Sequence, residues 1–460
     1  MPYQGGEHLP GQAASKTSHI DVIESPLMRD LVTRFERREF EDDQRLAPWF
    51  HLDVSGVAPL GNTVASDGSL HKVTSEDGFR ELCFVKTARF HLRTSDAAEV
   101  DPQFPHPLQI QRLMKDAAIH CNAVFPLRNM ALRRSANVRN SVRELIREII
   151  TYEHGGIVYK AMKWLMYQGW GPESESPDLG CPHCHEPAGP FPYDADESRC
   201  RRCTEPIHIT DVLGLHLDIG EDSATETVAS AYMAIHEVLL LVAHLYRLWR
   251  AGNLDAIDDT LFVKDGPLMF PRQYATLTRR MREMLAYFKD EEGRNIYLVG
   301  QEKSGMLFDH LQSQVRHLRQ HPDPDWPQVA ILSHAYMRDR VQRMPKAQHT
   351  YGSRTNYGEK ILVRLDASFA LALNVPTGVF MKAESAPSSP QDFIGLERII
   401  ATLPELVSYL HEGSLVPINL AHGIASLSYY PSGTALQRFS GVDDTALPPG
   451  VRLPKHPLDP

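Results

Sequence analysis

The sequence predicts an α/β protein with a mixed central sheet flanked by helices. Residues 260–264 have the composition of a strand, and residues 296–300 form a continuous apolar run typical of a buried parallel strand. Each precedes a segment with helical apolar spacing. A strand-rich stretch, residues 51–93, comes before them. This order, a strand with hairpin partners, then helices, then strand, helix, strand and helix, is that of an RNase H-like fold. Right-handed crossovers would place the first, fourth and fifth strands side by side and parallel.

Local patterns place the individual elements. Strands are expected where strand-forming residues gather, at 62–67, 70–74, 82–92, 260–264, 296–300, 360–365 and 370–373. Helices are expected where apolar residues recur at three and four positions, at 27–40, 108–124, 138–167, 225–250, 271–289, 306–318, 393–410 and 420–429. Residues 70–74 are expected to turn back as the hairpin partner of 62–67.

Length and composition are those of a globular protein. The chain has 460 residues, of which 42% are hydrophobic and 23% charged, enough for one large domain with insertions or for two or three domains. We divide it into an N-terminal arm with a possible partner-docking helix, a main domain, a cysteine module inserted in that domain, and an extended tail: residues 1–50, 51–440, 176–206 and 441–460. The net charge of −10 argues against a general nucleic-acid coat protein but is compatible with a local basic groove.

The N-terminal residues are polar and show no signal peptide, and the most apolar helical run, 238–246, is too short to span a bilayer. We therefore expect a cytoplasmic protein without membrane association. In a reducing compartment, clustered cysteines indicate metal binding and not disulfides.

Four of the six cysteines form two C-x2-C pairs, Cys181 with Cys184 and Cys200 with Cys203. Four thiolates complete a tetrahedral shell, so the pattern predicts a structural Zn²⁺ site in a small ribbon. Such a ribbon can bind a partner or DNA, or stiffen a loop. The two remaining cysteines, Cys83 and Cys121, are expected to be small core residues.

Two aspartates stand where a predicted strand meets a glycine: Asp67 before Gly68 and Asp265 before Gly266. Taken alone, each Asp-Gly pair is a common turn signal. At the carboxyl ends of adjacent parallel strands, however, their side chains would converge on one crevice, where ligands and metals bind. Mn²⁺ or Mg²⁺ is the expected metal, because both prefer carboxylate oxygens and keep waters for a substrate.

A third acidic ligand is expected from the helix that precedes Asp265. Glu237 lies beside the apolar stripe of that helix, whereas Glu226 lies in its first turn, where an acid complements the helix dipole. We favour Glu237 and keep Glu226 as the alternative. Lys303, after the strand at 296–300, can hold a phosphate or be a solvated lysine. His422, in an apolar helix, is either a satisfied core residue or a metal ligand or general acid.

The ordered set of these motifs resembles the NurA nuclease family: the Asp67-Gly-Ser segment, the helix with Glu237, the strand ending in Asp265-Gly-Pro-Leu, Lys303-Ser and the late Leu-Ala-His422. The resemblance covers residues 50–435, with the zinc module as an insertion. It implies an RNase H-like fold, metal-dependent cleavage of DNA and a homodimer. It also implies a hexameric HerA-like ATPase partner, in DNA end processing or anti-phage defence. Asp67, Glu237 and Asp265 would hold Mn²⁺ or Mg²⁺, His422 would complete the site and Lys303 would contact the phosphate.

Basic residues are expected to line a DNA path if this resemblance holds. The candidates are Arg128, Arg133, Arg134 and Arg139, then Arg279, Arg280 and Arg282, then Arg338, Arg340 and Arg343. Each cluster also fits a solvated helix face. The alternative function is a non-catalytic adaptor that uses the zinc ribbon and the N-terminal segment to hold a DNA translocase.

Overall fold

The computed structural model describes residues 23–34, 46–98, 118–133, 135, 137–219, 226–318, 325–344, 351–380, 388–407, 413–427 and 433–442. The N-terminal stretch up to residue 22 and the tail beyond Val442 lie outside these residues. The helices expected at 27–40, 108–124, 393–410 and 420–429 lie partly outside them.

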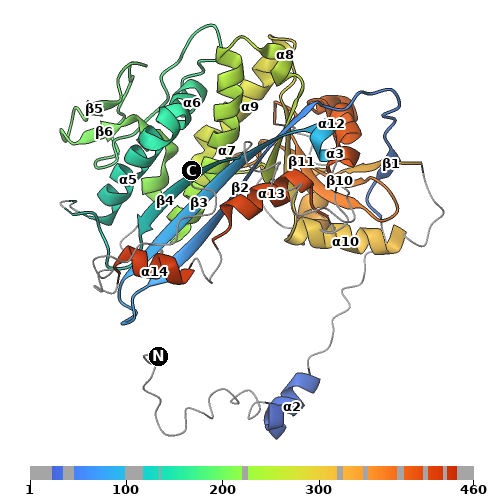
Figure 1. Cartoon of the computed structure of the whole chain (residues 1–460), viewed down its shortest axis with the longest axis horizontal. Coiled ribbons are helices and arrows are strands. Elements are labelled where there is room, and N and C mark those ends of the chain that lie inside the picture. The colour runs from blue at the N-terminus through green and yellow to red at the C-terminus, as the bar shows by residue number, and fades with distance from the viewer. Residues whose placement is uncertain are drawn as a thin grey trace.

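A nine-stranded mixed sheet runs through the molecule in the order β1-β9-β10-β11-β8-β7-β2-β3-β4 (Figure 1). Its strands are β1 (Trp49–His51), β2 (Asn62–Thr74), β3 (Glu81–Arg93), β4 (Ala118–Pro126), β7 (Thr260–Asp265), β8 (Tyr297–Glu302), β9 (Gln328–Ile331), β10 (Glu359–Arg364) and β11 (Ala370–Val375). β2, β7 and β8 are parallel neighbours, and the other described pairs in this sheet are antiparallel. The β4-β3-β2-β7-β8 portion has the RNase H-like order, which confirms the predicted α/β fold class.

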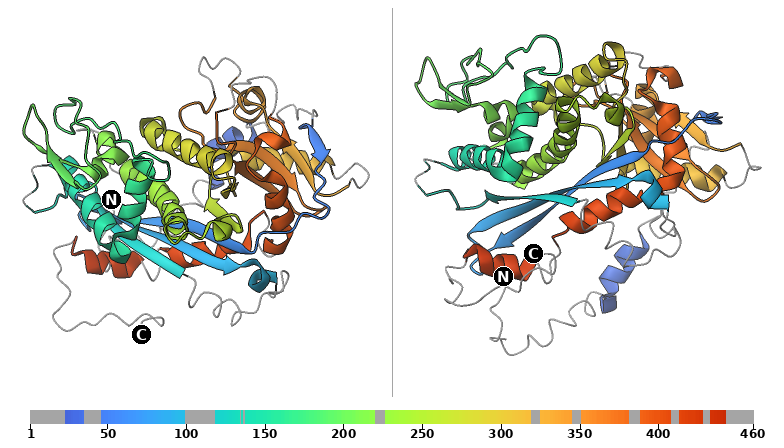
Figure 2. Two further views of the ribbon diagram at one scale, coloured as in Figure 1. Left: turned by 90° about the horizontal axis from the view of Figure 1, so that it is seen from above. Right: turned by 45° about the horizontal axis from the view of Figure 1, so that its top comes forward.

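Helices cover both faces of the sheet. The described α-helices are α2 (Pro26–Thr33), which does not pack on the sheet, α3 (Thr94–Ala98), α5 (Val138–Tyr152), α6 (Ile157–Met166), α7 (Glu226–Arg250), α8 (Leu254–Ile257), α9 (Ala275–Asp290), α10 (Met306–Leu318), α11 (His334–Tyr336), α12 (Leu396–Thr402), α13 (Val416–Ala425) and α14 (Thr434–Ser440). In Figure 2, α5, α6, α7 and α9 lie on one face of the β2–β4 ribbon, and α13 and α14 lie on the other.

Side-chain alternation in the strands builds a separate core on each face. In β7, Phe262 joins the core under α7 and α9, whereas Leu261 and Val263 join the core under α12 and α13. A residue on an odd position of this strand therefore faces α13, and a residue on an even position faces α7. The same rule assigns the faces of the polar residues that end the strand.

The expected hairpin at Asp67-Gly68 is wrong. β2 continues through both residues to Thr74 and pairs with β3 along its whole length, from Asn62 opposite Arg93 to Thr74 opposite Glu81. Only the parallel pairing with β7 stops nearby, at Ser66 opposite Lys264. By contrast, Asp265 does end its strand, and Gly266 follows it with φ at 84°. A φ in this range favours glycine, which has no Cβ.

Two other predictions need correction. Residues 118–126, expected to end a helix, form the edge strand β4, whose alternating burial matches a half-buried strand. The expected helix 138–167 is two helices, because His154, Gly155 and Gly156 all have positive φ and break it after Tyr152. β1 and β9, which the sequence did not predict, are short strands at the far edge of the sheet.

The long helix α7 is the one described helix that is long and apolar enough to cross a membrane. Within its most apolar window, 78% of the residues are buried inside the protein, between the sheet and α6. This is how the core helix of a soluble protein is placed.

The cysteine module lies beside α5 and α6 and contains the small sheet of β5 (Glu197–Arg199) and β6 (Pro206–His208) (Figure 1). A buried ion pair joins its flank to α5: Arg143 donates from Nε and Nη2 to both carboxylate oxygens of Asp211, at 2.8 and 2.7 Å. Bidentate geometry of this kind is the strongest form of an arginine–carboxylate contact. It fixes the module to the body.

Candidate active site

Asp67 and Asp265 lie on adjacent parallel strands and on the same face of the sheet. Their neighbours Ser66 and Lys264 are register partners, so the two aspartates follow side by side. The carboxyl groups are in hydrogen-bonding contact, and Asp67 also accepts from the backbone N–H of Gly68 at 2.7 Å. Asp67 is 3% exposed. The parallel pairing of β2 and β7 therefore brings together two acids that are far apart in the sequence.

The acidic residues repel one another electrostatically. Burial, followed by the negative charges of Asp265 and Glu237, raises the pKa of Asp67 from 3.8 to about 8, against the opposing effect of Lys303. Burial also raises the pKa of Glu237, while the Lys264 ammonium opposes the shift. Without a cation, Asp67 therefore holds a proton at neutral pH. A divalent cation would replace that proton.

Glu237 reaches the same region from the opposite face of the sheet. A Cβ built on Gly68 would lie 2.7 Å from Glu237 Oε1 and 2.6 Å from Met233 Cγ, so only a glycine leaves room for this approach. Gly68 follows Asp67 in the strand, and successive residues face opposite sides. Gly68, which resembled a turn signal, thus leaves a gap on the α7 face of β2 where a side chain would otherwise lie. The Glu237 carboxylate occupies this gap.

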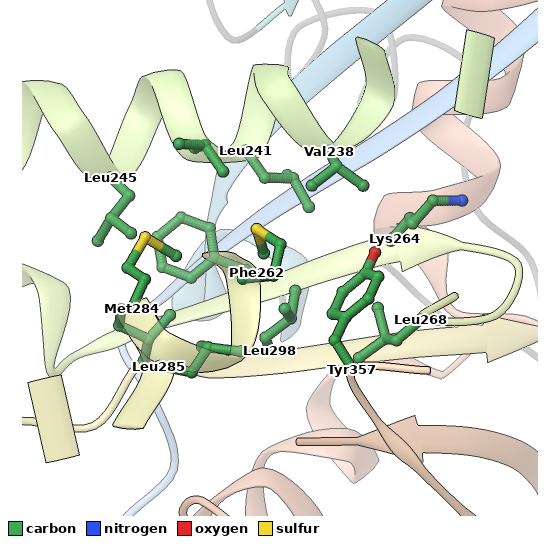
Figure 3. Close-up of a pocket in the computed structure, with 13 residues that line it drawn as sticks. Val238, Leu241, Leu245, Phe262, Lys264, Leu268, Met284, Leu285, Leu298 and Tyr357 are labelled. Atoms are coloured by element: carbon green, nitrogen blue, oxygen red, sulfur yellow. The ribbon is translucent and has the colours of Figure 1, made fainter. Parts of the chain in front are cut away.

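Lys264 is a site residue that the sequence analysis missed. Its Nζ lies 2.7 Å from Glu237 Oε2 and donates to the backbone carbonyl of Asp265 at 2.5 Å. The sequence did contain a signal for this residue. Lys264 directly follows the apolar residues Leu261–Val263 in a buried strand, and a buried lysine requires an acidic partner. Figure 3 shows its stem along an apolar cavity of about 20 Å³, with its ammonium directed away from that cavity. The cavity has room for about one water molecule and is not a substrate site.

Lys303 and His422 contact the two aspartates directly. Lys303 Nζ lies 3.0 Å from Asp265 Oδ2, and His422 Nδ1 lies 2.8 Å from Asp67 Oδ2. Gln301 of β8 helps to place His422: its side-chain amide donates to Gly413 O at 2.6 Å and accepts from Leu415 N at 3.2 Å, just before α13. The His422 side chain is 57% exposed, so the site opens to solvent on the α13 side.

Other candidates lie elsewhere. Glu226 contacts Lys72 at 3.7 Å near the start of α7, far along the helix from Glu237. Several of the arginines expected on a DNA path have internal partners, among them Arg139, which donates to Ile219 O at 2.8 Å. Arg280 is 1% exposed and bonds to Glu283, and Arg282 donates to the backbone of Ser353 at 3.0 Å. Arg134 lies outside the described residues.

The donor set fits a hard divalent cation, with one rearrangement. Three carboxyl groups face two ammonium groups, Lys264 and Lys303, so the group carries an excess negative charge once Asp67 loses its proton. Among the described residues, however, the oxygens of Asp67, Glu237 and Asp265 do not all lie within 4.8 Å of one another. Asp67 and Asp265 are already adjacent, and Glu237 would have to leave Lys264 to bind the same cation.

The four cysteines of the module form a compact group. All four sulfurs lie within 4.8 Å of one another, with 3.5 Å between Cys181 and Cys203 and between Cys184 and Cys200. Tetrahedral Zn–S bonds of about 2.3 Å require sulfurs about 3.8 Å apart. The two C-x2-C loops match, because His183 N bonds to Cys181 Sγ and Arg202 N to Cys200 Sγ, each at 3.4 Å. The geometry is consistent with a zinc ribbon.

Comparisons with known proteins give limited similarity. No family model matches the chain, and no curated protein matches it. Similar solved structures include the NurA nuclease from Sulfolobus solfataricus, with 8% identity, a TM-score of 0.32 and coverage of 94% of this chain and 97% of that one. A second NurA structure has 10% identity, a TM-score of 0.30 and coverage of 94% and 98%. These values do not assign the chain to a family.

Proposed function

We propose that this protein is a divalent-metal-dependent nuclease that hydrolyses phosphodiester bonds of DNA. The observation that carries the proposal is the contact between the Asp67 and Asp265 carboxyl groups on adjacent parallel strands, with Lys303 and His422 bound to them. Carboxylates in this arrangement hold Mn²⁺ or Mg²⁺. Bound metal would supply an activated water and stabilise the leaving oxygen of the phosphodiester.

Each residue at the site has a defined part in this proposal. Asp67, Asp265 and Glu237 are the metal ligands, and Glu237 exchanges Lys264 for metal. Lys303, whose side chain is 27% exposed beside Asp265, binds a phosphate oxygen of the substrate. His422 keeps one ring nitrogen on Asp67 and leaves Nε2 for a metal or for protonation of the leaving oxygen. The proposed contacts are to phosphate oxygens, which carry no sequence information, so cleavage is expected to show little sequence preference.

We further propose that the nuclease acts as a homodimer with a HerA-like hexameric ATPase, in DNA end processing or anti-phage defence. The exposed helix α2 is a suitable docking element. None of its residues is buried, and Leu27 and Val32 are 60% and 66% exposed. Isolated exposed apolar residues are ordinary, but a helix with no buried residue gains its stability from packing against something else.

The test is cleavage of linear DNA, with the chain alone and with a HerA-type ATPase, in Mn²⁺, in Mg²⁺ and in EDTA. Wild-type protein should degrade the DNA only with metal. Asp67→Asn and Asp265→Asn should each lower the rate by at least about 100-fold, because each removes a ligand charge. Asp255→Asn is the matched control, since this exposed carboxylate contacts only Arg294 in the described structure. Equal rates for the site variants and wild type, or no cleavage under any condition, would reject the proposal.

The adaptor remains the second candidate, because α2 and the cysteine module both present surface outside the sheet. It predicts tight binding of the ATPase with no metal-dependent hydrolysis. The acidic site favours the nuclease, because an adaptor does not require buried carboxylates that repel one another. The same assay, run beside a pull-down of the ATPase, separates the two.

A further inference from the structure

A second group of metal-ligand side chains lies in the core beside the acidic site. Cys121 comes from β4, His236 from α7, and Glu153 from the 3₁₀ turn Glu153–Gly156 between α5 and α6. Their ligand atoms all lie within 4.8 Å of one another. Cys121 is 2% and His236 1% exposed. Three elements that are remote in the sequence therefore converge on one buried point.

In the described structure, the polar atoms that face this point lack partners outside the group. His236 Nε2 is buried without a hydrogen bond, and the buried Glu153 Oε2 has only the Cys121 thiol beside it. The other polar atom of each side chain is occupied: His236 Nδ1 bonds to Thr87 Oγ1 at 2.8 Å, and Glu153 Oε1 accepts from Asn122 N at 2.7 Å. Leaving a buried polar atom unsatisfied costs about 1–3 kcal/mol. Metal-binding histidines are typically oriented in this way, by a hydrogen bond on the second ring nitrogen.

Charge compensation is missing as well. No lysine or arginine in the described part of the chain forms an ion pair with Glu153, although its carboxylate faces the core. A buried carboxylate without a countercharge is unfavourable, and a cation removes that penalty. One thiolate, one imidazole and one carboxylate suit Zn²⁺, whereas Mg²⁺ and Ca²⁺ bind almost entirely through oxygen.

We propose that Cys121, Glu153 and His236 bind a second Zn²⁺ ion in the protein core, distinct from the one expected in the four-cysteine module. Zn–ligand bonds of about 2.0–2.3 Å place tetrahedral ligands roughly 3.3–3.8 Å apart, so the three side chains need only small movements. The thiol releases its proton when it binds the metal. The fourth position takes a water molecule. Tyr232 stacks on His236 with ring centroids 5.1 Å apart, and its buried hydroxyl, which has no hydrogen-bond partner in the described structure, could bond to that water.

The ion would be coupled to the acidic site through the sheet and α7. Gly68, Thr87 and Cys121 are successive register partners across β2, β3 and β4, and His236 precedes Glu237 in α7. A metal bound by His236 and Cys121 would tie α7 to the edge strand. It would thus hold the part of the helix that carries Glu237 over Gly68. The proposed role of this ion is structural, and it does not depend on nuclease activity.

The test counts zinc in purified full-length protein, expressed with sufficient zinc and dialysed against excess Mg²⁺ so that the acidic site does not retain zinc. We expect about two zinc equivalents per chain for wild type, one for each site. Cys121→Ser should hold about one. Cys83→Ser, which makes the same change at a buried cysteine outside both clusters, should hold about two.

Two further measurements keep the result decisive. Glu153→Gln changes a partly exposed ligand and should also hold about one equivalent, so it replaces Cys121→Ser if that variant does not fold. In Co²⁺-substituted protein, loss of Cys121 should weaken the thiolate-to-metal absorption while the bands of the four-cysteine site persist. About one zinc equivalent in wild type, or unchanged zinc in both ligand variants, would overturn the proposal.

Discussion

Glu237 Oε2 lies 2.7 Å from Lys264 Nζ, on the face of the sheet opposite to Asp67. Both side chains are almost fully buried, so each needs the other as a countercharge. Lys264→Met should therefore lower the free energy of unfolding of the metal-free protein by about 3–5 kcal/mol, the usual cost of removing one partner of a buried pair. Chemical denaturation in EDTA measures this change.

The double variant Glu237→Leu with Lys264→Met is the control for that prediction. It removes both charges, and its stability should recover most of the loss, because apolar pairs often replace buried ion pairs without penalty. Mn²⁺ should stabilise Lys264→Met more than wild type, since the metal no longer competes with the lysine for Glu237. Additive losses in the double variant would show that the two residues do not act as a pair.

The raised pKa of Asp67 predicts a pH-dependent stability. The folded value is about 8 and the ordinary value is 3.8, so between these pH values the folded state holds a proton that the unfolded state has lost. Stability of the metal-free protein should therefore fall as pH rises from about 4 through about 8. Asp67→Asn should remove this part of the dependence and raise stability at pH 8 by more than about 1.4 kcal/mol, the value of one pKa unit. Unfolding curves at several pH values in EDTA provide the measurement.

Stabilisation by bound metal should depend on pH in the opposite direction, increasing as pH rises. Mn²⁺ has to displace the proton on Asp67, so the increase in melting temperature caused by Mn²⁺ should be larger at pH 8 than at pH 6. Asp255→Asn, at an exposed carboxylate, should behave as wild type. A stabilisation by Mn²⁺ that does not change with pH would argue against protonated Asp67 as part of the metal site.

The fold was predictable from the sequence where a strand was short and apolar or a helix was long. β7, β8, β10, β11 and α7 fall close to their expected ranges, and the parallel placement of β2, β7 and β8 follows from their order. β4 was missed because its apolar residues also fit a helical spacing over a short window. The continuation of β2 through Gly68 was missed because local turn preference was outweighed by pairing with β3 along the full strand.

The types of residue at the candidate site and the convergence of Asp67 and Asp265 were predictable, but the contacts of Glu237 were not. Alternation along β7 puts Lys264 and Asp265 on opposite faces, and this explains why Glu237 meets the lysine before it meets the aspartates. The group of Cys121, Glu153 and His236 could not be predicted from the sequence. Its members lie on an edge strand, a turn and a helix, and only the fold brings these elements together. Spacing identified the four-cysteine module because all of its ligands lie within one short segment.

Gly68 should tolerate no side chain. In Gly68→Ala, the new methyl group would meet Glu237 Oε1 and Met233 Cγ at less than 3 Å, and the helix or the carboxylate would have to move. We expect a stability loss of about 1–3 kcal/mol, as for an overpacked core, together with loss of metal-dependent cleavage. Gly423→Ala is the matched control, since no atom lies within 4 Å of its Cβ and α13 should gain stability. Full activity of Gly68→Ala would show that Glu237 does not need the gap in β2.

The cysteine module should depend on its metal for its own structure. Cys181 and Cys200 are buried in the core cluster shared with α5 and α6, so loss of the ion should unfold the module and expose part of that core. Cys200→Ser should lose the zinc of this site and become sensitive to protease within residues 176–206, while Arg143 and Asp211 still fix the flank of the module to α5. Mass spectrometry of the first cleavage products locates the cuts. Cleavage that begins in the sheet instead would mean that the module and the body unfold together.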